Sequence, residues 1–446
     1  MFSSNLSKRT IFFLTVFIDK TIKVLRRSLS KEKSNLRIRN RRTQKQILEI
    51  LSQEEAVVES IAALISNELN KTVEGVGASS HFNWIYELSA QIYKKRELVK
   101  NKDAENHKDL NLKVQKLDYK LFSMNQWDLL RYVSGCNGLY SLAYEFRQKS
   151  ITHALSLIEL KRLDTYDILK GFNAALESGN YKLLENYYKE AKKIRNRIRL
   201  PFKEIKFIYR LIIQNNHSKF HNSKTRYLPV RNKYGEYLLD KHIAVVGPAD
   251  TGEIDGNEID SFDIIVRPSY RGKNPAMSRE GFGSLPKISY YGNDFSRFIN
   301  GLENHSFFNE IFYTNFKAIK HEYQVKRIFK TNYSRDFNSL SDLFFTGSPT
   351  MILNIVMDLI TFRPMSIKIF KANLFLSNTP YAEGYKYEDA NLSHNWYGHW
   401  HHDIVSQFNL TKLLWKQGII EVDNNLTAIL NKSTSEYISD MEKIYS

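Results

Sequence analysis

The chain of 446 residues contains a single cysteine, Cys136, and no proline before Pro201. One thiol cannot form an intramolecular disulfide, so the composition favours a reducing cytosol and a buried apolar role for Cys136. Residues 11–18 form an apolar run after two cations, but a spanning helix needs about 20 apolar residues. Charges interrupt this run and no small-residue cleavage site follows it. We therefore expect neither a spanning helix nor a cleaved signal peptide here.

Positive charge is concentrated near the N-terminus. Of the formal net charge of +17, residues 1–46 hold thirteen Lys and Arg against Asp19 and Glu32, a net of +11. Cations beside an apolar run are typical of a segment that lies on an anionic lipid surface. We expect residues 1–46 to be an amphipathic arm that associates peripherally with the cytoplasmic face of the cell membrane. A disordered basic tail and a nucleic-acid-binding arm are the alternatives.

Residues 47–216 predict an all-α N-terminal domain. Apolar residues recur at helical spacing between Ile47 and Ile65. Further helical patterns cover residues 82–99, 110–132, 139–163, 166–177, 181–198 and 202–214. No unit recurs at a fixed period, so a repeat array is not predicted. This domain is either an acceptor- or partner-binding module or a helical scaffold.

The pattern changes after residues 217–240, which are polar and rich in turn residues and which we interpret as a linker or lead-in strand. From there to residue 446, short β-rich runs alternate with helical segments. The runs are residues 243–246, 262–266, 288–291, 311–313 and 367–370. This alternation predicts an α/β domain with a largely parallel sheet over residues 241–446. Such sheets bind ligands at the carboxyl ends of their strands.

The turn after the run at 243–246 is the first candidate binding segment. Gly247 and Gly252 have the spacing of a phosphate-binding P-loop, but Glu253 and Ile254 occupy the positions of its Lys and Ser or Thr. The dinucleotide pattern Gly-x-Gly-x-x-Gly is also absent. The nearby acids would repel a pyrophosphate and would suit sugar or ribose hydroxyls better.

A second candidate segment precedes an apolar helix that ends near Ile360. We expect Ser348 to be the N-cap of this helix and Pro349 to be its first residue. The N–H groups and the positive dipole end at a helix start form an anion site. A phosphate or a sugar carboxylate could bind there without a metal. An ordinary capped helix is the alternative.

Histidines gather in a third segment, residues 394–402, which hold four of the chain's twelve. They are His394, His399, His401 and His402. Zinc is disfavoured, because no cysteine lies nearby and no His pair at i, i+4 encloses a Glu. Histidine titrates near neutral pH and is the commonest general base. The cluster therefore favours catalysis over metal binding.

Taken in order, these segments resemble the motifs of the eukaryotic-type sialyltransferases, glycosyltransferase family 29, over residues 241–430. The matching residues are Val246-Gly247, Ile259-Asp260, Asp263, Val266-Arg267, Thr346-Gly347, His394-Asn395-Trp396-Tyr397 and His402-Asp403. Three departures occur. Pro248 and Pro268-Ser269 stand where the family has Asn, and Gln407 stands where it has Glu. The N-terminal half lies outside the resemblance.

The resemblance implies a single nucleotide-binding Rossmann-like domain, a variant of the GT-A type. It implies an inverting transfer of sialic acid or 3-deoxy-manno-octulosonate (Kdo) from a CMP donor to a glycan acceptor, without metal or cofactor, in capsule or lipopolysaccharide synthesis. His402 would be the general base, and His394 would assist the departing phosphate. The residues that would bind the nucleotide sugar are Gly247, Pro248, Ala249, Asp260, Arg267, Ser269, Thr346, Gly347 and Ser348.

Two further hypotheses stay open. One is a transferase-like scaffold without activity, because the Asn and Glu positions differ from the family. The other is a basic nucleic-acid-binding protein, which the low net charge outside residues 1–46 disfavours, so we expect no nucleic-acid partner.

Overall fold

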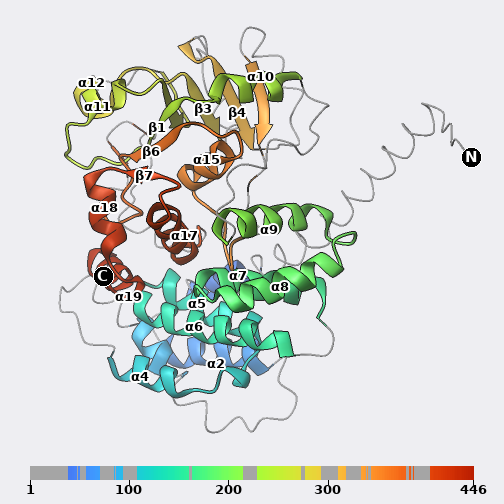
Figure 1. Cartoon of the computed structure of the whole chain (residues 1–446). Coiled ribbons are helices and arrows are strands. Elements are labelled where there is room, and N and C mark those ends of the chain that lie inside the picture. Colours follow the sequence, from blue (N-terminus) through green and yellow to red (C-terminus); the bar gives the residue numbers. More distant parts are fainter. Residues whose placement is uncertain are drawn as a thin grey trace, which may run out of the picture. The chain divides into compact units, whose positions relative to one another are not determined.

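A computed structural model of the chain shows two compact units, residues 1–209 and residues 210–446 (Figure 1). The structure describes residues 39–47, 49–50, 57–70, 85, 87–93, 108–159, 163–213, 229–272, 277–292, 310–317, 333–337, 339, 343–377, 381–382, 385 and 402–445. Throughout these segments, no helix is both long and apolar enough to cross a lipid bilayer. Most of the predicted basic arm, residues 1–38, lies outside the described residues.

The first unit is helical wherever it is described. Its helices are α2 (Val57–Asn70), α4 (Lys108–Lys116), η1 (Tyr119–Leu121), α5 (Met124–Cys136), α6 (Tyr140–Ser156), η2 (Leu157–Glu159), α7 (Thr165–Glu177), α8 (Tyr181–Lys193) and α9 (Arg199–Ile212). Residues 39–47, 49–50 and 87–93 are helical as well. The core includes Trp127, whose ring packs against Phe122 and Phe146 at centroid distances of 4.9 and 6.0 Å.

We predicted a single helix over residues 110–132, and this was wrong. Capping side chains divide the segment into α4, η1 and α5. Helix α4 ends at Lys116, and the Asp118 carboxylate then caps η1 by accepting a bond from the Lys120 N–H at 2.9 Å. Ser123 and Gln126 then form a reciprocal capping box that starts α5. Both caps satisfy N–H groups that an uninterrupted helix would have bonded internally.

The last residues assigned to the basic arm belong to this helical unit. Asn40 is 2% exposed, and its side-chain amide donates to Asp128 at 3.2 Å. Gln44 is equally buried and exchanges amide hydrogen bonds with Asn137. Buried polar groups need such partners. Residues 39–46 are therefore fixed by tertiary hydrogen bonds rather than separate from the fold.

The second unit is built on a seven-stranded sheet in which every pairing is parallel. Its order is β5-β4-β3-β2-β1-β6-β7. The strands are β1 (His242–Val246), β2 (Ile264–Pro268), β3 (Ile288–Tyr291), β4 (Tyr313–Lys317), β5 (Tyr333–Phe337), β6 (Ser366–Phe370) and β7 (Glu421–Val422). Its helices are α10 (Pro229–Leu238), α11 (Gly256–Asp260), α12 (Arg279–Phe282), α15 (Met351–Ile360), α17 (Ile404–Lys416), α18 (Asn424–Asn431) and α19 (Thr434–Tyr445).

This architecture confirms the predicted Rossmann-like α/β domain preceded by a helical region. From β1 the chain builds strands outward on one side, and β6 then pairs with the other side of β1. Open α/β sheets bind ligands at such a switch in strand order. One local prediction was wrong, because residues 229–238 form helix α10 where we expected a linker or lead-in strand.

Candidate functional site

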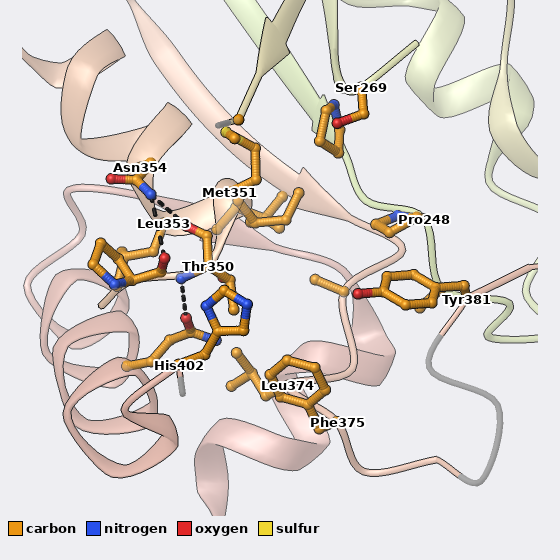
Figure 2. Close-up of a pocket in the computed structure, with 18 of the residues that line it drawn as sticks. Pro248, Ser269, Thr350, Met351, Leu353, Asn354, Leu374, Phe375, Tyr381 and His402 are labelled. Carbon is orange, nitrogen blue, oxygen red and sulfur yellow. Dashed lines mark hydrogen bonds between the residues drawn. The ribbon is translucent and has the colours of Figure 1, made fainter. Parts of the chain in front are cut away.

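A pocket of about 370 Å³ lies at the carboxyl ends of the strands in the second unit (Figure 2). Pro248 and Ala249 reach it from the turn after β1, and Lys371 reaches it from the segment after β6. Pro268 and Ser269 line it at the end of β2 and just beyond it. The pocket therefore occupies the switch point of the sheet, where this fold class places its ligands.

The charge of this pocket is of one sign. Arg271, Lys317 and Lys371 line it together with His402, and no Asp or Glu is found among the described residues that do so. Each of the two lysines sits at the end of a strand or one residue beyond it, β4 and β6 respectively. A pocket with cations and without carboxylates favours an anionic ligand.

Gly247 brings two backbone segments together after β1. Its N–H donates to the Phe370 carbonyl at 2.7 Å, and the next bond runs from the Ala249 N–H to the Lys371 carbonyl at 3.1 Å. A Cβ atom on Gly247 would lie 2.2 Å from the Lys371 carbonyl oxygen. The absent side chain therefore makes room for the neighbouring chain segment, and Gly247 itself lies behind the pocket lining.

Asp260 and Arg267, both predicted to bind the nucleotide sugar, contact the loop after α12 instead of lining the pocket. Asp260 accepts bonds from the Ser284 N–H at 2.5 Å and from Arg279 Nε at 2.9 Å. Arg267 is 6% exposed and donates to the Phe282 carbonyl at 2.5 Å. Burial lowers the pKa of Arg267 to about 10. Both side chains therefore hold residues 279–284 in place and do not line the pocket.

Ser269 lines the pocket in a strained backbone conformation. Its φ is +47°, and its N–H donates to the Tyr290 carbonyl at 2.7 Å as β2 ends. Nearby, the Tyr385 hydroxyl donates to the Pro268 carbonyl at 3.0 Å. In Figure 2 the hydroxyl of Tyr381 points toward the middle of the pocket. Non-glycine residues with positive φ are uncommon and often lie at functional sites.

Helix α15 begins two residues later than predicted. Thr350, not Ser348, is its N-cap, and Met351 is its first residue. The Thr350 N–H donates to the Gln407 side-chain oxygen at 2.8 Å, so a residue of α17 fixes this helix start. Ser348 and the first turn of α15 still line the pocket. The expected anion-binding helix start therefore faces the cavity.

The side chain of Asp403 connects the segment His402-Asp403 to the segment Thr346-Gly347. This carboxylate is 1% exposed and accepts bonds from the Thr346 N–H at 2.7 Å and the Thr346 hydroxyl at 2.8 Å. It also accepts from the Ser406 hydroxyl at 3.0 Å and the Ser406 N–H at 3.2 Å, which caps α17. A Cβ on Gly347 would lie 2.5 Å from the Asp403 nitrogen. The two segments are therefore fixed against each other.

His402 shares this pocket with Pro248, Ser269 and Ser348. It is half-buried, and its ring stacks on Phe375 at a centroid distance of 6.4 Å. Its neighbour Asp403 anchors the segment that carries it. His394, the second predicted catalytic residue, lies outside the described residues.

An acidic cluster lies beside Lys371. Ligand atoms of Glu253, Asp255 and Asp423 all lie within 4.8 Å of one another, a spacing that could hold a metal ion. However, the Lys371 ammonium lies 3.1 Å from Asp255 and also donates to the Glu253 carbonyl. Burial raises the pKa of Asp423 to about 6. An ammonium group therefore already supplies positive charge to these carboxylates.

No protein-family model and no curated protein sequence matches this chain. The resemblance to family 29 therefore rests on the motifs quoted above. Sequence reasoning missed Arg271, Lys317, Lys371, Tyr381 and Tyr385, all of which line the pocket. For Lys371 a signal was present, because it directly follows the strand predicted over residues 367–370; Lys317 ends the observed β4 but lies four residues beyond the run predicted at 311–313.

Proposed function

We propose that the second unit is a CMP-sugar-dependent glycosyltransferase that transfers sialic acid or Kdo to a glycan hydroxyl. The observation that carries this proposal is the pocket at the sheet's switch point, which combines the cations Arg271 and Lys317, a helix start and His402 and has no described carboxylate in its lining; Lys371 also lines it, but its ammonium pairs with Asp255. We also propose that the acceptor belongs to a bacterial capsule or lipopolysaccharide and that the enzyme acts at the cytoplasmic face of the membrane.

The charge of the pocket suits such a donor. CMP-activated 2-keto acids carry two anionic groups, the phosphate and the sugar carboxylate. The start of α15 offers N–H groups and its positive dipole end to one of them. Arg271 and Lys317 can neutralise negative charge that develops on the phosphate as it leaves. A metal is not required for these interactions.

His402 is assigned as the general base. The acceptor oxygen forms a bond to the anomeric carbon, and the bond from that carbon to the phosphate oxygen breaks with its electron pair on CMP. The acceptor proton passes to the imidazole, a contribution of about 10²–10⁴-fold to the rate. Asp403 is a positioning residue, because its bonds to Thr346 hold the segment that carries His402.

The test is CMP release from CMP-sialic acid and from CMP-Kdo with candidate glycan acceptors. We expect His402→Ala to lower kcat by about 10²-fold or more with CMP affinity retained. His242→Ala is the matched control, since His242 is exposed at the start of β1. Full turnover by His402→Ala, with loss in His394→Ala or His399→Ala, would refute the assignment of His402. The absence of CMP binding by the wild-type chain would refute the proposed function.

The inactive scaffold is the second candidate, and it predicts CMP binding without turnover of either donor. The departure at Gln407 does not favour it. The Gln407 amide oxygen accepts the Thr350 N–H at 2.8 Å, a bond that a Glu carboxylate oxygen could accept equally well. Gln at this position is therefore compatible with an intact helix start at the pocket.

A further inference from the structure

Outside the N-terminal arm, one helical hairpin holds a net positive charge equal to that of the whole remaining chain. Residues 1–46 hold +11 of the net +17, which leaves +6 for the rest of the chain. Residues 182–203, which we name the basic hairpin, contain eight Lys and Arg against Glu185 and Glu190. That stretch alone is +6, so the remaining residues beyond position 46 are balanced in charge.

The seven cations of the basic hairpin whose burial is described are all exposed, and each of its two acids pairs with one of them. Lys189 bonds Glu185 at 2.9 Å, and Lys193 bonds Glu190 at 2.6 Å. The Glu185 and Glu190 side chains stay 47% and 32% exposed in these pairs, beside the exposed cations. Five of them have no acidic partner within the described parts of the chain, namely Lys182, Lys192, Arg195, Arg197 and Lys203. The surplus is therefore available to an external anion.

Buried side chains and stacked aromatic rings hold the helices that carry these charges. Leu184, Tyr187 and Ala191 bury the inner side of α8 in the first unit. Tyr188 stacks on Tyr209 of α9 at a centroid distance of 3.9 Å and on Phe202 at 6.0 Å. Figure 1 shows α8 and α9 as neighbouring green helices. These three rings pack against one another, whereas Tyr181, the first residue of α8, is 45% exposed.

We propose that the basic hairpin docks on an anionic lipid surface. Proteins that bind single-stranded nucleic acid stack bases on available aromatic rings, whereas Tyr188 and Phe202 are already stacked here. Recognition would therefore depend on charge, and each Lys or Arg near an anionic bilayer contributes about 1 kcal/mol. Stable peripheral attachment usually takes two signals. The hairpin would be the second signal beside the basic N-terminal sequence, independently of what the second unit catalyses.

The test uses the full chain and sedimentation with vesicles of phosphatidylglycerol and phosphatidylcholine. In the hairpin variant, Lys192, Arg195, Arg197 and Lys203 are each changed to Gln. The matched control removes the same charge from exposed sites elsewhere, by changing Lys116, Lys120, Lys241 and Lys416 to Gln. We expect the hairpin variant to bind about tenfold more weakly or worse, and the control to change by less than about twofold.

Further readouts complete the test. Binding should weaken as salt is raised and should vanish on pure phosphatidylcholine vesicles. CMP affinity and circular dichroism should match the wild type, which shows that the hairpin variant folds. Equal loss in both variants, or none in either, would overturn the proposal. Hairpin-dependent binding of RNA or DNA, with unchanged vesicle binding, would overturn it as well and identify a nucleic-acid surface.

Discussion

Replacing Asp403 by Ala should lower the free energy of unfolding of the second unit by several kcal/mol. The carboxylate accepts four hydrogen bonds from Thr346 and Ser406 at 1% exposure. A hydrogen bond to a charged group contributes about 1.5–3 kcal/mol, and the four are not additive because the donors share one acceptor group. The change leaves the buried donors of Thr346 and Ser406 without an acceptor, at about 1–3 kcal/mol for each donor that finds no other partner, so we expect a total cost of about 3–5 kcal/mol. With an m-value of about 3 kcal/mol/M in urea, the midpoint should fall by roughly 1 to 1.7 M.

Amide hydrogen exchange of peptides from α15 and α17, followed across a urea series, separates the second unit from the first. Ser406→Ala is the matched control, because it removes one of the four bonds and should cost only about 1 kcal/mol. An Asp403→Ala midpoint within about 0.3 M of the wild type would refute the reasoning. It would mean that Thr346 and Ser406 find other partners.

Three more predictions follow from the second unit. Gly247→Ala should lower the free energy of unfolding in urea by about 2–3 kcal/mol, because the new Cβ would clash with the Lys371 carbonyl oxygen. A variant with unchanged stability and altered ligand affinity would contradict the packing role of Gly247. The pKa of Asp423 is raised to about 6, so the native state keeps a proton that the unfolded chain loses. Stability should therefore fall by about 2 kcal/mol as pH rises from 4 to 7, and an Asp423→Asn variant that shows the same slope would refute the assignment. Arg335→Met should cost about 3–5 kcal/mol in thermal unfolding, because the buried Asp358 loses its ion pair, and a second change of Asp358→Leu should recover most of the loss.

Much of the fold could be predicted from local pattern. Buried parallel strands are continuous apolar runs, and five of the seven strands were predicted within a few residues. Strand β5 was not predicted, because Arg335 and Asp336 interrupt the apolar pattern that indicates a buried strand. Arg335 is nonetheless buried, since it pairs with Asp358 and lies over the Tyr234 ring at 4.1 Å. A tertiary ion pair of this kind leaves no signal in the strand's own sequence.

The candidate site divides in the same way. The family resemblance selected Pro248, Ala249 and Ser269, which line the pocket. It also selected Asp260 and Arg267, whose side chains turn to a neighbouring loop. The neighbouring sequence does not distinguish the residues that line the pocket from those that do not. The direction of each side chain depends on which segment packs against it in the folded domain.

The two bonds that hold the pocket's helix start come from late in the chain. Thr346 and Thr350 are bonded to Asp403 and Gln407, each 57 residues further along. During synthesis, the ribosome would have to release α17 before this binding loop could settle. A nascent chain that ends before α17 could thus contain strands β1 to β6 and still lack the bonds that fix this helix start. Proteolytic removal of α17 would break the same bonds in the folded chain.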